Sequence, residues 1–166
     1  MKELSVEIIL PAPVDQVWKV LTNFDDYSSW NPYVSMEGQP VSNGRVKLAS
    51  VAGAGKLSTT TYAAISKLVP MSELELRNGI PFLTESVRFF KLSPVEDRTL
   101  LRHGVRFTGA LAGKRHSTEG KVRQLRNYYD AFGKALTDRL LGRRLRNPSG
   151  NRHARRRREA GRPRPG

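Results

Sequence analysis

The stretch from residue 33 to residue 109 most constrains the fold. In it, runs rich in β-branched and aromatic residues alternate with short clusters of turn-forming residues. The connections are too short to hold a crossover helix, so neighbouring strands are expected to run antiparallel. An alternating apolar pattern predicts one further strand near the start of the chain. The predicted strands cover residues 3–10, 33–39, 45–52, 57–69, 71–77, 84–93 and 98–109.

Apolar residues at three- and four-residue spacing predict helices on either side of this stretch. The first begins after Pro13, which suits a helix start, and a second short turn places Tyr27 and Trp30 on one face before Asn31. A long amphipathic helix follows Gly120, with its apolar face made by Val122, Leu125, Tyr129, Phe132, Leu136 and Leu140. This order predicts an α+β fold, in which a curved sheet covered by the last helix leaves a cavity between them.

The positive charge is concentrated at the end of the chain. The 166 residues carry a net charge of +14, and residues 142–166 contain ten arginines against one glutamate. This segment has too few apolar residues to offset the entropy cost of ordering it. We therefore expect one domain at 1–141 and a disordered Arg-rich tail at 142–166. The tail could attract nucleic acid or lipid headgroups without specificity, or act as a solubilising appendage, which is the commoner use of a charge run.

Several classes of protein are excluded or disfavoured. The chain has no cysteine, which excludes disulfide scaffolds and thiolate metal sites. It begins with neither a signal-peptide pattern nor an apolar run of membrane-spanning length, so a cytoplasmic location is expected. Residues 53–58 depart from the phosphate-binding loop pattern, and His116 with Glu119 forms only an isolated His-x-x-Glu pair. No cofactor and no metal site is predicted.

The segment at residues 11–32, PAPVDQVWKVLTNFDDYSSWNP, closely resembles the opening signature of the START-like, or SRPBCC, superfamily. Residues 70–79 (PMSELELRNG), 90–94 (FKLSP) and 99–109 resemble its later strands, and the closing helix resembles its last element. The resemblance spans residues 3–141. It implies a helix-grip fold, with a curved seven-stranded antiparallel sheet wrapped around the long C-terminal helix and two short helices after the first strand. Members of this polyketide cyclase/dehydrase and lipid-transport group carry lipids, cyclise or dehydrate polyketides, or assist multi-protein assemblies.

Strand parity identifies the residues that could carry chemistry. In residues 99–107 the odd positions are mostly apolar, so His103 is expected on the pocket wall. An ordinary histidine pKa makes it the best general acid/base candidate, although a buried histidine is more often simply hydrogen-bonded in place. Arg88 lines the cavity if Phe90 also faces inward, and could then pair with a ligand carboxylate or an enolate. It lies on the surface in the other register. Tyr62 offers a phenol whose facing the pattern leaves open.

The candidate ligand-binding residues share apolar or pocket-facing positions in the predicted elements. Trp30 is expected to be mainly structural, because aromatic residues on apolar faces usually pack in the core. The full set is Trp30, Asn31, Leu48, Leu76, Phe90, Leu101, Val105, Phe107, Tyr129 and Phe132.

Two further features have competing interpretations. The loop at residues 79–83 is unusually apolar for a connection, and predicts either a portal or membrane-touching lip or a cover for the core. Glu73 and Glu75 share a strand face opposite Leu74 and Leu76, and are expected to be solvated rather than to form a catalytic pair.

The sequence favours a carrier or sensor that holds a hydrophobic small molecule, such as a lipid or a polyketide-like compound, between the sheet and the last helix. A polyketide cyclase/dehydrase that uses His103, Arg88 and Tyr62 is the first alternative. The second alternative is nucleic-acid binding through the basic tail.

Overall fold

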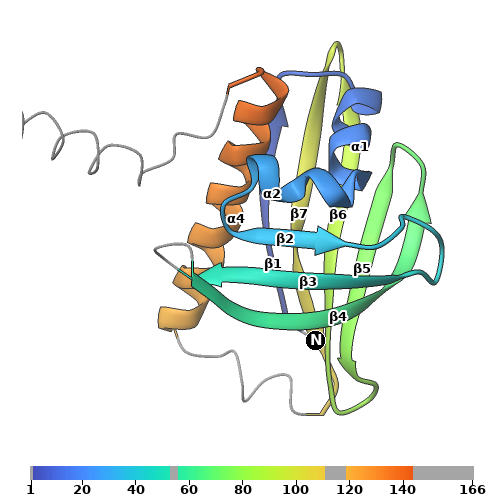
Figure 1. Cartoon of the computed structure of the whole chain (residues 1–166), viewed down its shortest axis with the longest axis vertical. Helices are drawn as coiled ribbons and strands as arrows, with labels where there is room; N and C mark the ends of the chain where they lie inside the picture. Colours follow the sequence, from blue (N-terminus) through green and yellow to red (C-terminus); the bar gives the residue numbers. More distant parts are fainter. Residues whose placement is uncertain (1, 53–55, 111–118, 144–166) are drawn as a thin grey trace, which may run out of the picture.

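The computed structural model describes residues 2–52, 56–110 and 119–143. The strands are β1 (Lys2–Leu10), β2 (Val34–Glu37), β3 (Arg45–Ala52), β4 (Lys56–Val69), β5 (Glu73–Ile80), β6 (Thr84–Val95) and β7 (Arg98–Thr108). The helical segments are α1 (Val14–Thr22), the 3-10 turn η1 (Phe24–Asp26), α2 (Tyr27–Trp30) and the long α4 (Glu119–Leu140). Figure 1 shows their arrangement.

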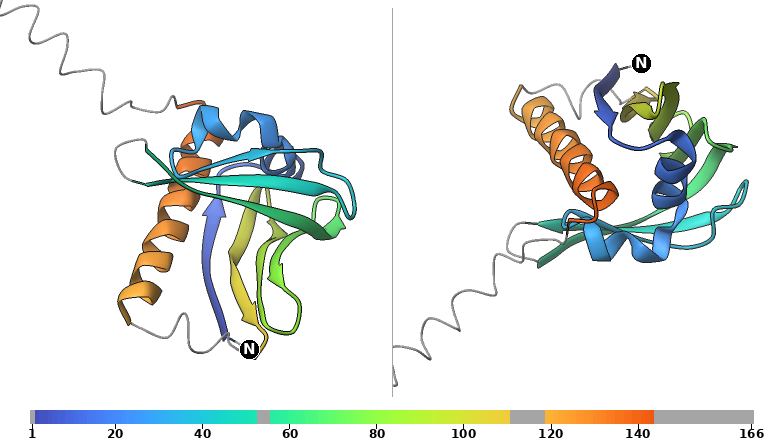
Figure 2. Two further views of the ribbon diagram at one scale, coloured as in Figure 1. Left: turned by 60° about the horizontal axis from the view of Figure 1, so that its bottom comes forward. Right: turned by 90° about the horizontal axis from the view of Figure 1, so that it is seen from above.

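The strands form one antiparallel sheet in the order β1-β7-β6-β5-β4-β3-β2. The sheet is strongly curled, so that β2, β3 and β4 run across the direction of β1, β6 and β7 (Figure 1). Helix α4 lies along the hollow side next to β1, while α1 and α2 close one end of the hollow (Figure 2). This is the predicted α+β helix-grip arrangement, and the prediction is confirmed.

Local hydrogen bonds explain how the chain turns from α1 into the sheet. Tyr27 donates its hydroxyl hydrogen to the carbonyl oxygen of Leu21, at a distance of 2.9 Å, and so ties η1 and α2 to the end of α1. The side-chain oxygen of Asn31 accepts hydrogen bonds from the backbone amides of Tyr33 and Val34. An asparagine that bonds its own following backbone forms a turn, so Asn31 ends α2 and starts β2.

The predicted end of β5 at residue 77 is wrong. The strand continues through Asn78 and Gly79 to Ile80, and pairs with β6 over its whole length. Gly79 has a φ of +110°, and a Cβ added there would lie 2.1 Å from the carbonyl oxygen of Thr84. Only glycine fits this position, so the residue that suggested a break instead permits a close approach between strands. Strand β6 likewise extends to Val95, beyond the predicted residue 93.

Glu73 and Glu75 are less exposed to solvent than the sequence analysis predicts. Each is only 9% exposed. Glu73 forms ion pairs with Lys67 and Lys91, and Glu75 with Arg106. These glutamates lie on the face of β5 opposite to the buried leucines and are held by neighbouring cations rather than by water alone.

Three other expectations concern the loop at residues 79–83, membrane-spanning helices and the C-terminal tail. The loop at 79–83 does not cover the core, because Phe82 is 92% exposed and Ile80 and Leu83 are exposed too. Within the described ranges no helix is long and apolar enough to cross a membrane. The predicted Arg-rich tail lies outside the described residues apart from positions 142 and 143, so its disorder remains a prediction.

Candidate functional site

The interior between the sheet and α4 divides into a packed half and an accessible half. On β1 the inward side chains change from the fully buried Leu10 to the partly accessible Leu4. On β7, the register partners of Leu10 and Leu4 are the buried Thr99 and Val105, and the same row reaches the partly accessible Phe107 beyond Val105. The apolar face of α4 changes in parallel, from the buried Leu136 near its end to partly accessible residues in its first turns. The accessible ends of these rows all lie at the end of the fold opposite to α1 and α2.

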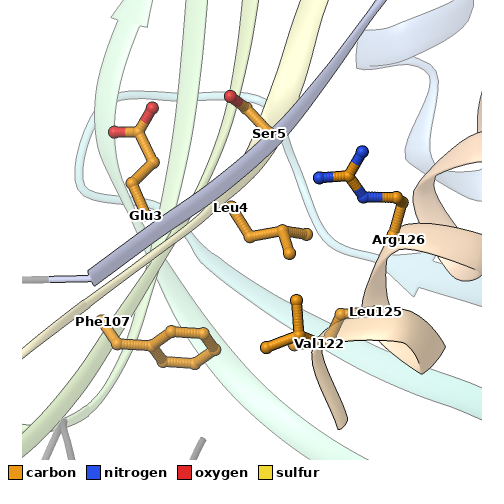
Figure 3. A pocket seen from close by; sticks show the side chains of 7 residues that line it. All are labelled: Glu3, Leu4, Ser5, Phe107, Val122, Leu125 and Arg126. Atoms are coloured by element: carbon orange, nitrogen blue, oxygen red, sulfur yellow. The ribbon is translucent and has the colours of Figure 1, made fainter. Parts of the chain in front are cut away.

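A pocket of about 330 Å³ opens in the accessible half, between β1 and the first turns of α4 (Figure 3). Its inner wall is apolar, with Leu4, Phe107, Val122 and Leu125 facing one another. The lining also contains polar residues, namely Glu3, Ser5 and Arg126. This volume is at the lower end of the range for small-molecule sites, which are typically apolar clefts with few polar groups.

An aromatic cluster closes the packed half beneath α4. The ring centroid of His103 lies 6.1 Å from that of Phe90, which is stacked on it, 5.3 Å from Tyr129 and 5.2 Å from Phe132. Tyr129 and Phe132 come from α4, whereas Phe90 and His103 are register partners on β6 and β7. The cluster therefore joins the helix to the middle of the sheet.

His103 is completely enclosed, with 0% of its surface exposed. Among the described residues neither ring nitrogen has a hydrogen-bond partner. Burial, with a smaller contribution from the charge of Arg88, lowers the pKa of His103 to about 4. The imidazole is therefore neutral at physiological pH, so it can accept a proton but cannot act as a protonated acid.

Arg88 lies on the inward face of β6. It pairs with Leu76 on β5 and Val105 on β7, on the same face as Phe90 and His103. Of the two registers that the sequence left open, the structure has the one that points Arg88 into the hollow. Although Arg88 is deep in the fold, it keeps some accessible surface, which shows that it faces a space open to water-sized molecules.

The surroundings of Arg88 are aromatic. Its side chain lies beside Tyr129, and its guanidinium carbon lies 5.7 Å from the centre of the Tyr128 ring. Desolvation lowers the pKa of Arg88, but the interactions with Tyr128 and Tyr129 outweigh it and hold the pKa above its ordinary value. Desolvation in turn raises the pKa of Tyr129 to about 12, so its phenol is neutral beside a charged guanidinium.

One step further toward the accessible end, β5 and β6 contribute a polar pair. The hydroxyl of Ser86 donates a hydrogen bond to the side-chain oxygen of Asn78. Both residues keep some accessible surface and follow Arg88 along the inward rows. Arg88, Asn78 and Ser86 are therefore polar groups within an otherwise apolar lining.

The other predicted site residues lie in the packed core, in the turn after α2 or on the outer face of the sheet. Trp30 is buried in the packed half, with its ring centroid 5.6 Å from that of Phe132. The side-chain oxygen of Asn31 accepts the backbone hydrogen bonds of the turn that follows α2. Leu48, Leu76, Leu101 and Val105 are buried as well. Tyr62 is 53% exposed on the outer face, where Arg45 lies over its ring at 4.4 Å. It points away because its neighbour Ala63 takes the inward position of β4.

Sequence reasoning did not assign a binding role to three residues of the apolar pocket wall, or to Tyr128 beside Arg88. Leu4, Val122 and Leu125 occupy predicted apolar faces, but periodicity cannot distinguish a lining position from a packed one. Tyr128 contacts Arg88 from a helix position beside the main apolar stripe, and no sequence pattern indicates it. In the described part of the chain, no cluster of His, Asp or Glu residues could hold a metal ion.

Comparison with known proteins agrees with this architecture. Residues 1–140 match the family described as polyketide cyclase / dehydrase and lipid transport. No curated protein matches the chain.

Solved structures with 18% identity or less share the fold. The DynU16 crystal structure, of a putative protein in the dynemicin biosynthetic locus, superposes with a TM-score of 0.65 at 18% identity, covering 87% of this chain and 50% of that one. A START superfamily protein from Mycobacterium smegmatis gives a TM-score of 0.61 at 16% identity, with 82% and 95% covered. CalU16 from Micromonospora echinospora gives a TM-score of 0.56 at 17% identity, with 84% and 78% covered.

A family match over most of the chain and a curled sheet gripping a C-terminal helix lead to the same assignment: the chain belongs to the polyketide cyclase/dehydrase and lipid-transport family of START-like helix-grip proteins.

Proposed function

We propose that this protein binds a hydrophobic small molecule, lipid-like or polyketide-like, in the space between the sheet and α4, and acts as a carrier or sensor. The observation that carries the proposal is the pocket of about 330 Å³, with an apolar inner wall, at the accessible end of the interior. Burying apolar ligand surface there is favourable by about 25 cal/mol per Å². The family match supports the same kind of ligand.

The test is binding by the purified full-length protein, measured by native mass spectrometry and titration with a panel of fatty acids, sterols and polyketides. Leu125→Trp should fill the pocket and weaken binding at least tenfold. Gln124→Trp provides the matched control, because Gln124 is the exposed neighbour on the same helix. If no compound binds, or if Leu125→Trp binds as well as the control variant, the proposed pocket is not the binding site.

Catalysis as a polyketide cyclase/dehydrase is a second candidate, favoured by the proximity of Arg88 and Tyr129 on the inner wall. A guanidinium and a phenol could stabilise an enolate in a water-poor site. His103 would serve only as a base, and its enclosure requires that α4 move before a substrate reaches it. In a reconstituted reaction, His103→Gln should lower turnover; unchanged turnover and product profile would remove His103 as the base.

A further inference from the structure

The positive charge of Arg88 has no negative partner in the described part of the chain. Among residues 2–52, 56–110 and 119–143, no carboxylate lies within ion-pair distance of its guanidinium. Its near neighbours are the phenols of Tyr128 and Tyr129 and the neutral imidazole of His103. An unpaired charge in a protein interior is costly, and proteins usually pair such charges.

The local geometry suits an anion. A guanidinium cannot accept a hydrogen bond, so the neighbouring Tyr129 can donate its hydroxyl hydrogen only to another group. Together the two side chains present several donors and one positive charge on the inner wall, which is the arrangement that binds a carboxylate strongly.

The register relates this polar position to the apolar pocket. Arg88 pairs with Val105, and Val105 pairs with Leu4 on the next strand. Two strand spacings separate Arg88 from Leu4, a distance of about 10 Å across the sheet. Leu4 and Val122 belong to the apolar wall of the pocket. A molecule that extends from the pocket to Arg88 therefore needs a polar group at its inner end and an apolar chain at its outer end.

Building on the proposed function, we infer that the bound molecule carries a carboxylate, held at the inner end of the cavity by Arg88 and the Tyr129 hydroxyl, with its apolar chain directed toward Leu4 and Val122. The ligand is thus an amphipathic carboxylic acid bound head-inward. It supplies the negative charge that no described residue places beside Arg88.

The experiment compares decanoate with decanol, which share a chain length and differ in charge, by titration calorimetry on the full-length protein. Decanoate is expected to bind at least tenfold more tightly. Arg88→Gln should remove this preference and leave decanol affinity within about threefold, since charge-assisted hydrogen bonds are lost while the apolar wall is kept. Arg123→Gln, which removes an exposed arginine from the same helix as Tyr129, should keep the preference.

Each outcome separates the two proposals. If neither compound binds, the proposed function fails and the inference fails with it. If both bind equally, the pocket stands and the carboxylate site is overturned. If Arg126→Gln at the pocket abolishes the preference and Arg88→Gln does not, the head group lies at Arg126 and the inward orientation is wrong.

One readout does not depend on the ligand affinity of a variant. In the unchanged protein, decanoate but not decanol should shift the NMR signal of the Arg88 side-chain N–H. Equal shifts with both compounds would overturn the inference even if Arg88→Gln did not fold.

Discussion

Protonation of His103 should make the stability of this fold depend on pH. Burial lowers the pKa of His103 in the folded protein from 6.5 to about 4. In the unfolded chain the pKa returns to its ordinary value, so between these pH values the unfolded state binds a proton that the folded state does not. Above the pKa that His103 has in the unfolded chain, the free energy of unfolding is therefore unaffected by this group. It decreases as the pH falls from that value toward the pKa of His103 in the folded protein.

The magnitude follows from this shift. Lowering the pH from neutral to about 5 should cost about 2 kcal/mol of the free energy of unfolding, and full titration below about pH 4 should cost about 3 kcal/mol. His103→Leu removes the titrating group at nearly constant volume. Since neither ring nitrogen of His103 has a partner in the described structure, this change breaks no hydrogen bond there.

Urea unfolding of both proteins at several pH values measures the effect. Carboxylates also titrate in this range, but they are common to both proteins and cancel in the difference, as do the other two of the three histidines. The unchanged protein should lose about 2 kcal/mol more than His103→Leu on going to about pH 5. Parallel stability curves, or an NMR titration of His103 with an ordinary pKa, would refute the argument that this imidazole is enclosed and neutral.

Three other perturbations have defined outcomes. Tyr27→Phe removes the buried hydrogen bond to the Leu21 carbonyl and should cost about 1 to 3 kcal/mol in chemical unfolding; a neutral result would show that water replaces the hydroxyl. Gly104→Ala places a Cβ 2.1 Å from a carbonyl oxygen of β1 and should cost about 3 kcal/mol or more, whereas Gly120→Ala, with nothing within 4 Å, should be neutral or stabilising. Removing the residues after Leu141 deletes ten arginines and should abolish any salt-sensitive binding to nucleic acid without unfolding the domain, and binding that survives truncation would contradict a tail-driven contact.

Much of the fold could be predicted because its elements have strong local signals. Alternation in β1 and helical spacing in α4 each place apolar residues on one face, and short connections force antiparallel pairing. The errors occur where tertiary contacts outweigh local preference. Gly79 reads as a turn in the sequence, but in the sheet its missing side chain lets the strand continue beside Thr84.

The candidate site was less predictable. The sequence placed His103 on an inward face, but not beneath α4 with both nitrogens unpartnered, because that depends on which helix residues meet it. Arg88 could face either way from its own strand pattern, since Phe89 and Phe90 are both apolar and both buried. Tyr62 lies outside because the small Ala63 takes the inward place.

By itself, the sequence determined the order of the elements, the antiparallel sheet and the family signature, because these depend on periodicity and on turn residues close together along the chain. Only the tertiary structure decided where the interior is solid and where it is open, and that Arg88 lies in it without a carboxylate from the described residues. Those properties depend on how side chains from strands and helix distant in the sequence fill a shared volume, which no local pattern specifies.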